Sequence, residues 1–351
     1  MLIIGCDFHT RFQQIAIVDT TTGEIVTRRL EHENGEARKF YAALPSPARV
    51  GIEATIAAQW FERMLHEHHH ELWIGDAAQI RAAMVRKQKT DSRDALHILD
   101  LLLRDKFPRI WIPSPEDRDL RQMLRHRHKV VCLRTSVENQ LHALAMSQGL
   151  CRKAKLWTVA GRKQLEGLQL DPWASRRRRE LLQLLDQLDP QIDELNEAVI
   201  QESESRPEAV HLMKQPGVGP VTALAFVLTI GPVKRFPTSK KLVSYLGLNP
   251  SEDSSGGRQR LGAISKQGNS MIRHLLVEAA QVASRFDPEL RRDYLRLKFR
   301  RGHSGVAKVA IARKLAVRLY WQLREAAQPV PLARMQGSPT VPMVDESPST
   351  L

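Results

Sequence analysis

The first hundred residues alternate between strand-like and helix-like segments, and no other feature of the sequence restricts the fold as much. An apolar run at 2–8 is followed by an alternating stretch at 14–30, which turns at its TTTG sequence and predicts a β-hairpin. Further segments are in turn helix-like or strand-like: 36–44 (helix), 48–55 (strand), 56–68 (helix), 71–76 (strand) and 94–103 (helix). Three leading strands followed by alternating helices and strands predict an α/β domain over residues 1–110.

The pattern changes near Pro113 and Pro115, and residues 111–207 predict a helical middle region. Apolar spacing over 117–147 is typical of one long helix. A second stretch has apolar residues at alternating intervals of four and three: Leu181, Leu185, Leu188, Ile192, Leu195 and Val199. This heptad spacing predicts a two-helix seam, either in a helical hairpin or in a dimerising coiled coil. Pro190 interrupts it, so we expect a kink or a new helix that starts after Asp189.

Residues 208–327 predict a mainly helical C-terminal domain. Its PGVGPVTA segment (216–223) resembles a helix-hairpin-helix turn, in which the backbone amides of Gly217 and Gly219 would hold a DNA phosphate. A merely tight turn is the alternative. The tail at 328–351 is rich in proline and serine, and we expect it to be disordered. The predicted fold class is therefore multidomain, an α/β domain followed by two helical regions.

The charge of the chain points to a polyanionic partner. Lysine and arginine total 53 against 39 aspartate and glutamate residues, a net charge of +14. Nucleic acid is the simplest such partner, and a membrane surface is the alternative. The longest uncharged apolar run, 221–233, is shorter than the roughly 18 residues of a membrane span, so we expect no membrane partner. Aromatic residues are only 5% of the chain, which favours phosphate and shape contacts over base stacking.

The N-terminus and the cysteines predict a cytoplasmic protein, nucleoid-associated when bound to DNA. The first residues lack a charged segment and reach Asp7 too early for a signal peptide. Cys6, Cys132 and Cys151 have neither disulfide-framework nor zinc-knuckle spacing.

Four acids are placed where an α/β domain builds sites. Asp7 and Glu53 end strand-like segments, and Asp91 and Asp94 begin a helix, three residues apart on one face. Because ligand sites form at the carboxyl edge of such sheets, we expect these side chains to converge and to hold divalent cations. Each acid could also have an ordinary role: Asp91, for example, as a first-turn acid favoured by the helix dipole, and Asp94 as an ion-pair partner of Arg93 or of a nearby lysine.

The stretches IGCDFHT, GIEAT and KTDSRDA resemble those of the DEDD transposases of the IS110 family of insertion sequences. The N-terminal domain of that family resembles the Holliday-junction resolvase RuvC and has a ribonuclease-H-like fold. The resemblance implies that Asp7, Glu53, Asp91 and Asp94 form a catalytic metal site that binds Mg²⁺, as two ions.

The same resemblance implies a catalytic serine in the C-terminal domain. In that family a PGVG segment opens the transposase domain, and a sequence like YLGLNP (245–250) precedes a Ser-Gly dipeptide. Ser255-Gly256 matches the dipeptide, so Ser255 is the predicted nucleophile, with the adjacent Ser254 as the alternative. Attack by a serine on a phosphodiester conserves the bond energy in a phosphoserine ester.

Several basic residues are predicted to contact phosphates, although solvated surface cations are the common alternative. They are Lys266, Arg273, Lys308, Arg313 and Lys314. The resemblance further implies a structured bridge RNA that pairs with donor and target DNA, and a dimer that assembles into a tetramer, in which the metal site and the serine meet across subunits. A RuvC-like structure-selective endonuclease and a non-catalytic nucleic-acid-binding protein are the alternatives to this RNA-guided recombinase.

Overall fold

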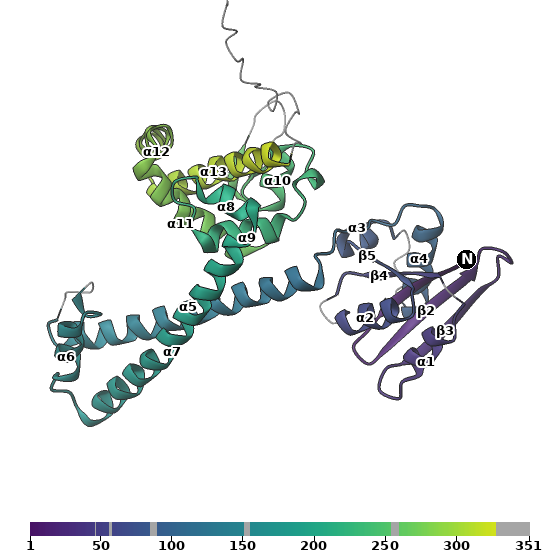
Figure 1. The fold of residues 1–351 in the computed structure, drawn as a ribbon, viewed down its shortest axis with the longest axis horizontal. Helices are drawn as coiled ribbons and strands as arrows, with labels where there is room; N and C mark the ends of the chain where they lie inside the picture. The colour runs from purple at the N-terminus through teal and green to yellow at the C-terminus, as the bar shows by residue number, and fades with distance from the viewer. Residues whose placement is uncertain (46, 56–57, 85–89, 151–154, 254–259, 328–351) are drawn as a thin grey trace, which may run out of the picture. The chain divides into compact units, whose positions relative to one another are not determined.

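The computed structural model describes the chain except for residues 46, 56–57, 85–89, 151–154, 254–259 and 328–351 (Figure 1). The chain forms two compact units, Met1–Ile112 and Pro113–Leu351. The predicted C-terminal domain and all but the first two residues of the predicted middle region lie within the second unit.

The first unit is built on a five-stranded sheet in the order β3-β2-β1-β4-β5. Its strands are β1 (Leu2–Phe8), β2 (Phe12–Asp19), β3 (Ile25–Glu31), β4 (Ala48–Glu53) and β5 (Glu71–Gly75). The first three strands pair antiparallel, and β4 and β5 continue the sheet parallel to β1. The predicted hairpin and α/β layer are confirmed, and this mixed sheet is consistent with a ribonuclease-H-like fold.

Helices cover both faces of this sheet. The helices α1 (Glu36–Ala42) and α2 (Gln59–Glu67) pack on the face that carries Ile4, Cys6 and Ile52. The opposite face, which carries Ile3, packs against α3 (Ala77–Ala82) and α4 (Asp91–Leu103). The sequence did not predict α3, a six-residue helix whose N-cap Asp76 accepts a hydrogen bond from the Gln79 amide.

A glycine allows α4 to lie directly on β1. A Cβ atom at Gly5 would lie 2.3 Å from the Ala95 carbonyl oxygen and 2.4 Å from the Leu99 nitrogen. Side chains two residues apart on a strand point to the same face, so Asp7 faces α4 as Gly5 does. The close packing at Gly5 therefore brings the first turn of α4 to the end of β1.

We expect Gly5→Ala to destabilise the first unit by about 3 kcal/mol, the upper part of the usual range for overpacking, because the clash is with helix backbone. Gly51→Ala is the matched control, since Gly51 pairs with Gly5 in the neighbouring strand. There the three atoms nearest to the new Cβ all belong to the Leu102 side chain, the nearest at 2.7 Å, and that side chain can rotate. Urea unfolding of the full chain measures both. Equal losses in the two variants would contradict the close helix–strand contact.

Two long helices form a hairpin in the second unit. They are α5 (Pro115–Ser147) and α7 (Pro172–Glu204), and the shorter α6 (Val159–Glu166) contributes to the same core (Figure 1). The heptad residues Leu181, Leu185, Leu188 and Ile192 are buried there with Val137 and Leu141 of α5. The predicted long helix is confirmed, and of the two alternatives for the apolar seam, the structure contains the helical hairpin.

The expected new helix after Asp189 is wrong, because α7 runs through Pro190 without ending. Proline removes one backbone donor and clashes with the preceding turn, at about 3 kcal/mol. Leu188 and Ile192, on either side of Pro190, are both buried in the core with α5. Tertiary packing thus holds a helix that local preference would interrupt.

The remaining elements surround a second hydrophobic core. These are α8 (Pro207–Met213), α9 (Pro220–Ile230), the 3-10 helix η2 (Val233–Arg235), α10 (Ser239–Tyr245), the strands β6 (Pro250–Glu252) and β7 (Leu261–Ile264), α11 (Ser270–Phe286), α12 (Pro288–Arg301) and α13 (Ser304–Ala326). Most residues of α9 are buried, as expected for a helix that is apolar on all sides. No helix in the described ranges combines the length and the apolarity needed to cross a membrane.

Candidate metal centre and nucleic-acid contacts

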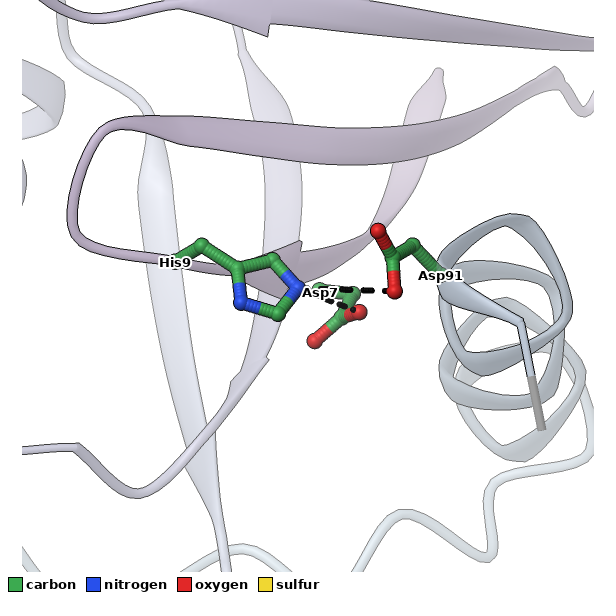
Figure 2. A group of neighbouring side chains, drawn as sticks. All are labelled: Asp7, His9 and Asp91. Atoms are coloured by element: carbon green, nitrogen blue, oxygen red, sulfur yellow. Dashed lines mark hydrogen bonds and ion pairs between the residues drawn. The ribbon is translucent and has the colours of Figure 1, made fainter.

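Two of the predicted acids converge where β1 ends and α4 begins, together with a histidine (Figure 2). Oδ2 of Asp7 lies 3.1 Å from Nε2 of His9, and Oδ1 of Asp91 lies 3.8 Å from the same nitrogen. One potential ligand atom from each of the three residues lies within 4.8 Å of the other two. The three side chains therefore form one compact group.

His9 is held in place by the turn between β1 and β2. Its backbone amide donates to the Phe12 carbonyl at 3.0 Å, and its ring stacks on the Phe12 ring with centroids 4.6 Å apart. The Arg29 guanidinium in turn lies 3.6 Å from the centre of the Phe12 ring. His9 was not among the residues predicted for the site. Its position two residues after Asp7 was the available signal, because this spacing keeps side chains on one side of an extended chain.

The electrostatics of Asp7 suit a cation. Burial raises the pKa of the Asp7 carboxyl, the nearby charges of Asp94 and Asp91 raise it further, and His9 opposes the rise. Asp94 lies one turn after Asp91 on α4, and its Oδ1 atom is buried. Gathered carboxylates repel one another, and a bound divalent ion removes that repulsion.

The spacing of the group fits a shared ion. Bonds of about 2.1 Å in octahedral geometry place neighbouring ligand atoms about 3 Å apart and opposite ones about 4.2 Å apart. The distances from His9 Nε2 to Asp7 and Asp91, 3.1 and 3.8 Å, fall in this range. Two carboxylates and an imidazole can thus hold one divalent cation with small adjustments.

Glu53 lies beside Asp7 in the sheet, but its carboxylate is not in the group. Cys6 pairs with Ile52 in the parallel register, and Asp7 and Glu53 are the next residues of the two strands. The Glu53 carboxylate instead lies 3.8 Å from the Arg81 guanidinium, and its side chain is 41% exposed. The backbone permits a shared site, while the side chain is directed to α3. Its role as a ligand stays a prediction.

The predicted nucleophile Ser255 and its alternative Ser254 lie outside the described residues. The strands that flank them pair antiparallel, with Pro250 opposite Ile264. Beyond the strands, the Asp253 amide donates to the Arg260 carbonyl at 3.0 Å. The hairpin therefore holds Asp253 and Arg260 close together.

The two glycines of the predicted helix-hairpin-helix turn differ in their surroundings. Gly217 has a φ of 85°, and a Cβ there would lie 2.4 Å from the Ala279 carbonyl of α11. Close packing thus accounts for this glycine without a ligand. Gly219 is the N-cap of α9, and open space surrounds the position of its missing Cβ. Of the two, Gly219 is the one that a phosphate could approach.

Two of the predicted phosphate-binding cations have partners within the chain. Arg273 donates to the Gln267 carbonyl and, at 3.4 Å, to the Leu246 carbonyl, which braces the loop before α11. Lys314 pairs with Asp293, whose side chain is 9% exposed. Both have a structural role, and their phosphate contacts stay predictions.

The other three predicted cations are placed differently. Lys266 has a positive φ of 56° and donates its amide to the Gly247 carbonyl at 3.2 Å. Arg313 is exposed on α13, and Lys308 lines a groove. These positions leave Arg313 and Lys308 accessible to a phosphate.

Two family models match the chain. A model of DEDD transposases of the IS110 type, described as "Transposase", matches residues 4–147. A second model, described as "Transposase IS116/IS110/IS902 family", matches residues 209–295. The first match includes Asp7, Glu53, Asp91 and Asp94, and the second includes the segment with Ser255.

Relatives that align over most of the chain are also transposases by name. A Pseudomonas aeruginosa protein named "Probable family 20 transposase" is 29% identical over 328 residues, which cover 91% of this chain and 96% of that protein. The transposase for insertion sequence element IS1328 of Yersinia enterocolitica is 29% identical and covers 81% of this chain and 85% of its own length. The transposase for element IS1111A of Coxiella burnetii is 27% identical, and the alignment covers 81% of this chain and 78% of that protein.

Proposed function

This chain belongs to the IS110 family of DEDD transposases, and we propose that it moves its insertion sequence by RNA-guided DNA strand exchange through a serine–DNA intermediate. The observation that carries the proposal is the convergence of Asp7 and Asp91 with His9 where β1 ends and α4 begins. This group lies within the region matched by the DEDD model.

The metal site of the proposal is formed by Asp7, Glu53, Asp91 and Asp94, with His9 as an additional ligand. Mg²⁺, as two ions, would neutralise these acids and stabilise the charge on a reacting phosphate. Asp7 needs to be ionised to take part, and burial together with neighbouring carboxylates works against its ionisation. His9 favours the ionised form, so it would prepare Asp7 for a cation.

The serine step is a transesterification. Ser255 Oγ forms a bond to phosphorus, the P–O bond of the DNA strand breaks, and the hydroxyl proton is given up while the departing DNA oxygen gains one. A hydroxyl of the second DNA strand then attacks the phosphoserine and restores the serine. The number of phosphodiester bonds is unchanged, so neither ATP nor hydrolysis is required.

Guide RNA and subunit number rest on the resemblance to the family. A bridge RNA pairing with donor and target DNA would place sequence choice in base pairing, and the protein would read shape and backbone. The net charge of +14 supports such a role. A dimer that assembles into a tetramer would let the metal site of one subunit serve the serine of another.

A RuvC-like endonuclease is the second candidate, because the same carboxylate group could instead activate water. The test is to purify the full chain, sequence the RNA that copurifies, and incubate the complex with donor and target duplexes and Mg²⁺. We expect recombinant strands that need both the RNA and Mg²⁺ and that EDTA prevents. Cleaved but unjoined strands, formed without RNA, would support the endonuclease instead.

A further inference from the structure

The charged side chains that line one groove of the second unit are all basic. The groove has a volume of about 400 Å³ and lies between α11, α12 and the beginning of α13. Arg285, Arg291 and Lys308 supply its cations, and Tyr294 and Leu295 supply apolar surface. Among the described residues, no acidic side chain lines it, which favours an anionic occupant.

These three cations are available for a ligand. In the described part of the chain, no ion pair is formed by Arg285, Arg291 or Lys308. Arg285 and Arg291 are exposed, and Lys308 is half-buried. Surface cations without acidic partners can bind phosphates and release counterions.

The helix α12 strengthens the positive field around the groove. It has six basic and two acidic residues. Both acids are already neutralised: Asp293 pairs with Arg296 and Lys314, and Glu289 pairs with Arg318. The net positive charge of the helix is therefore presented to solvent. Leu295, at 53% exposed, adds apolar surface beside the cations.

We propose that this groove binds a single-stranded segment of nucleic acid, with Arg285, Arg291 and Lys308 on consecutive phosphates. Tyr294 and Leu295 would contact a sugar or a base. The phosphodiester backbone is common to a guide RNA and to an exposed DNA strand. The inference deepens the proposed function, which requires both polymers, but it depends only on the charge and shape of the groove.

Fluorescence anisotropy with labelled U20 and dT20 tests the proposal. The full chain, freed of RNA and kept in EDTA, is titrated over a range of salt concentrations. We expect Arg291→Gln and Lys308→Gln each to reduce the magnitude of the log–log salt slope by about 0.7, the value for one phosphate contact to a single strand. A larger change with U20 would assign the groove to RNA, and a larger change with dT20 would assign it to DNA.

Arg300→Gln is the matched control, because it removes the same charge from the same helix. Residue 300 follows residue 291 by nine positions, about two and a half turns, so it lies on the opposite side of α12. We expect it to leave the slope unchanged. Equal reductions of the salt slope in Arg291→Gln and Arg300→Gln would contradict binding in the groove and would indicate a diffuse basic surface. An unchanged slope in both variants would exclude binding at α12. Unchanged melting temperatures would confirm that the variants fold. Strand exchange is measured separately, so failure here leaves the proposed function standing.

Discussion

Asp7→Asn is expected to abolish strand exchange while leaving the metal-free protein as stable as the wild type, or more stable. Loss of an oxygen ligand from the proposed metal site should remove about 4 kcal/mol of transition-state stabilisation, which is about 10³-fold in rate. The free energy of unfolding, in contrast, should stay the same or increase. The raised pKa of Asp7 means that the folded protein binds this proton more tightly than the unfolded chain does, so stability is lost as pH rises through the folded pKa. A neutral amide avoids that loss at pH 7.

Asp100→Asn provides the control for this substitution. Asp100 lies on the same helix as Asp91, nine residues later, and forms an ion pair with Arg104 at 2.8 Å. Neutralising it should change the rate less than about twofold, because Asp100 is not part of the Asp7, His9 and Asp91 group. Stability should change little, because exposed ion pairs contribute little to it. His9→Gln should give an intermediate loss of about 10- to 100-fold, as expected for a residue that orients a ligand or binds beside it. Rates come from recombinant-strand assays, and stability from melting in EDTA. A stable Asp7→Asn protein with normal rates would remove the metal site from the mechanism.

Ser255→Ala is expected to eliminate any covalent protein–DNA species and all strand exchange. Without the hydroxyl, no phosphoserine ester can form, so the bond energy of the broken strand is not conserved. A nicked DNA junction with a phosphorothiolate at the scissile position, incubated with Mg²⁺, should trap the adduct with the wild-type protein. Mass spectrometry of the digested adduct identifies the linked residue.

Ser254→Ala distinguishes the two adjacent serines. We expect it to retain the adduct, since the Ser-Gly dipeptide of the family matches Ser255-Gly256. An adduct that survives Ser255→Ala but is lost in Ser254→Ala would transfer the nucleophile to Ser254. Cleavage that persists in both variants without any adduct would favour water as the nucleophile, and hence the endonuclease.

The acids of the candidate site could be predicted because their chemistry is tied to local sequence. Asp7 lies at the end of a largely buried strand, and Asp91 and Asp94 share one face of a helix start. Both patterns depend on residues close in the chain. His9 was missed because its role depends on what lies across from it. Its spacing from Asp7 was a local signal, but that spacing alone does not distinguish a ligand from a turn residue. The Asp91 carboxylate, 3.8 Å from Nε2 of His9, comes from a helix remote in the chain.

Glu53 and Pro190 are two positions where contacts remote in the chain led to a result that local sequence did not predict. The strand register that puts Glu53 next to Asp7 could be anticipated, but its pairing with Arg81 could not, because α3 was not predicted. Pro190 has a strong local preference against a helix interior, and yet α7 continues, because its neighbours are buried against α5. Long-range packing outweighs local preference at that position.

The sequence by itself determined the order of strands and helices in the first unit apart from α3, the long helices with their apolar seam, and the acids available for a metal. These follow from the period of apolar residues and from side-chain chemistry, both of which are local. Only the tertiary structure decided which of the possible metal ligands lie close to one another. Gly5 lets a helix more than eighty residues away rest on β1, and this contact sets the distances between Asp7, His9 and Asp91. Such distances depend on atoms remote in the chain, which no local pattern specifies.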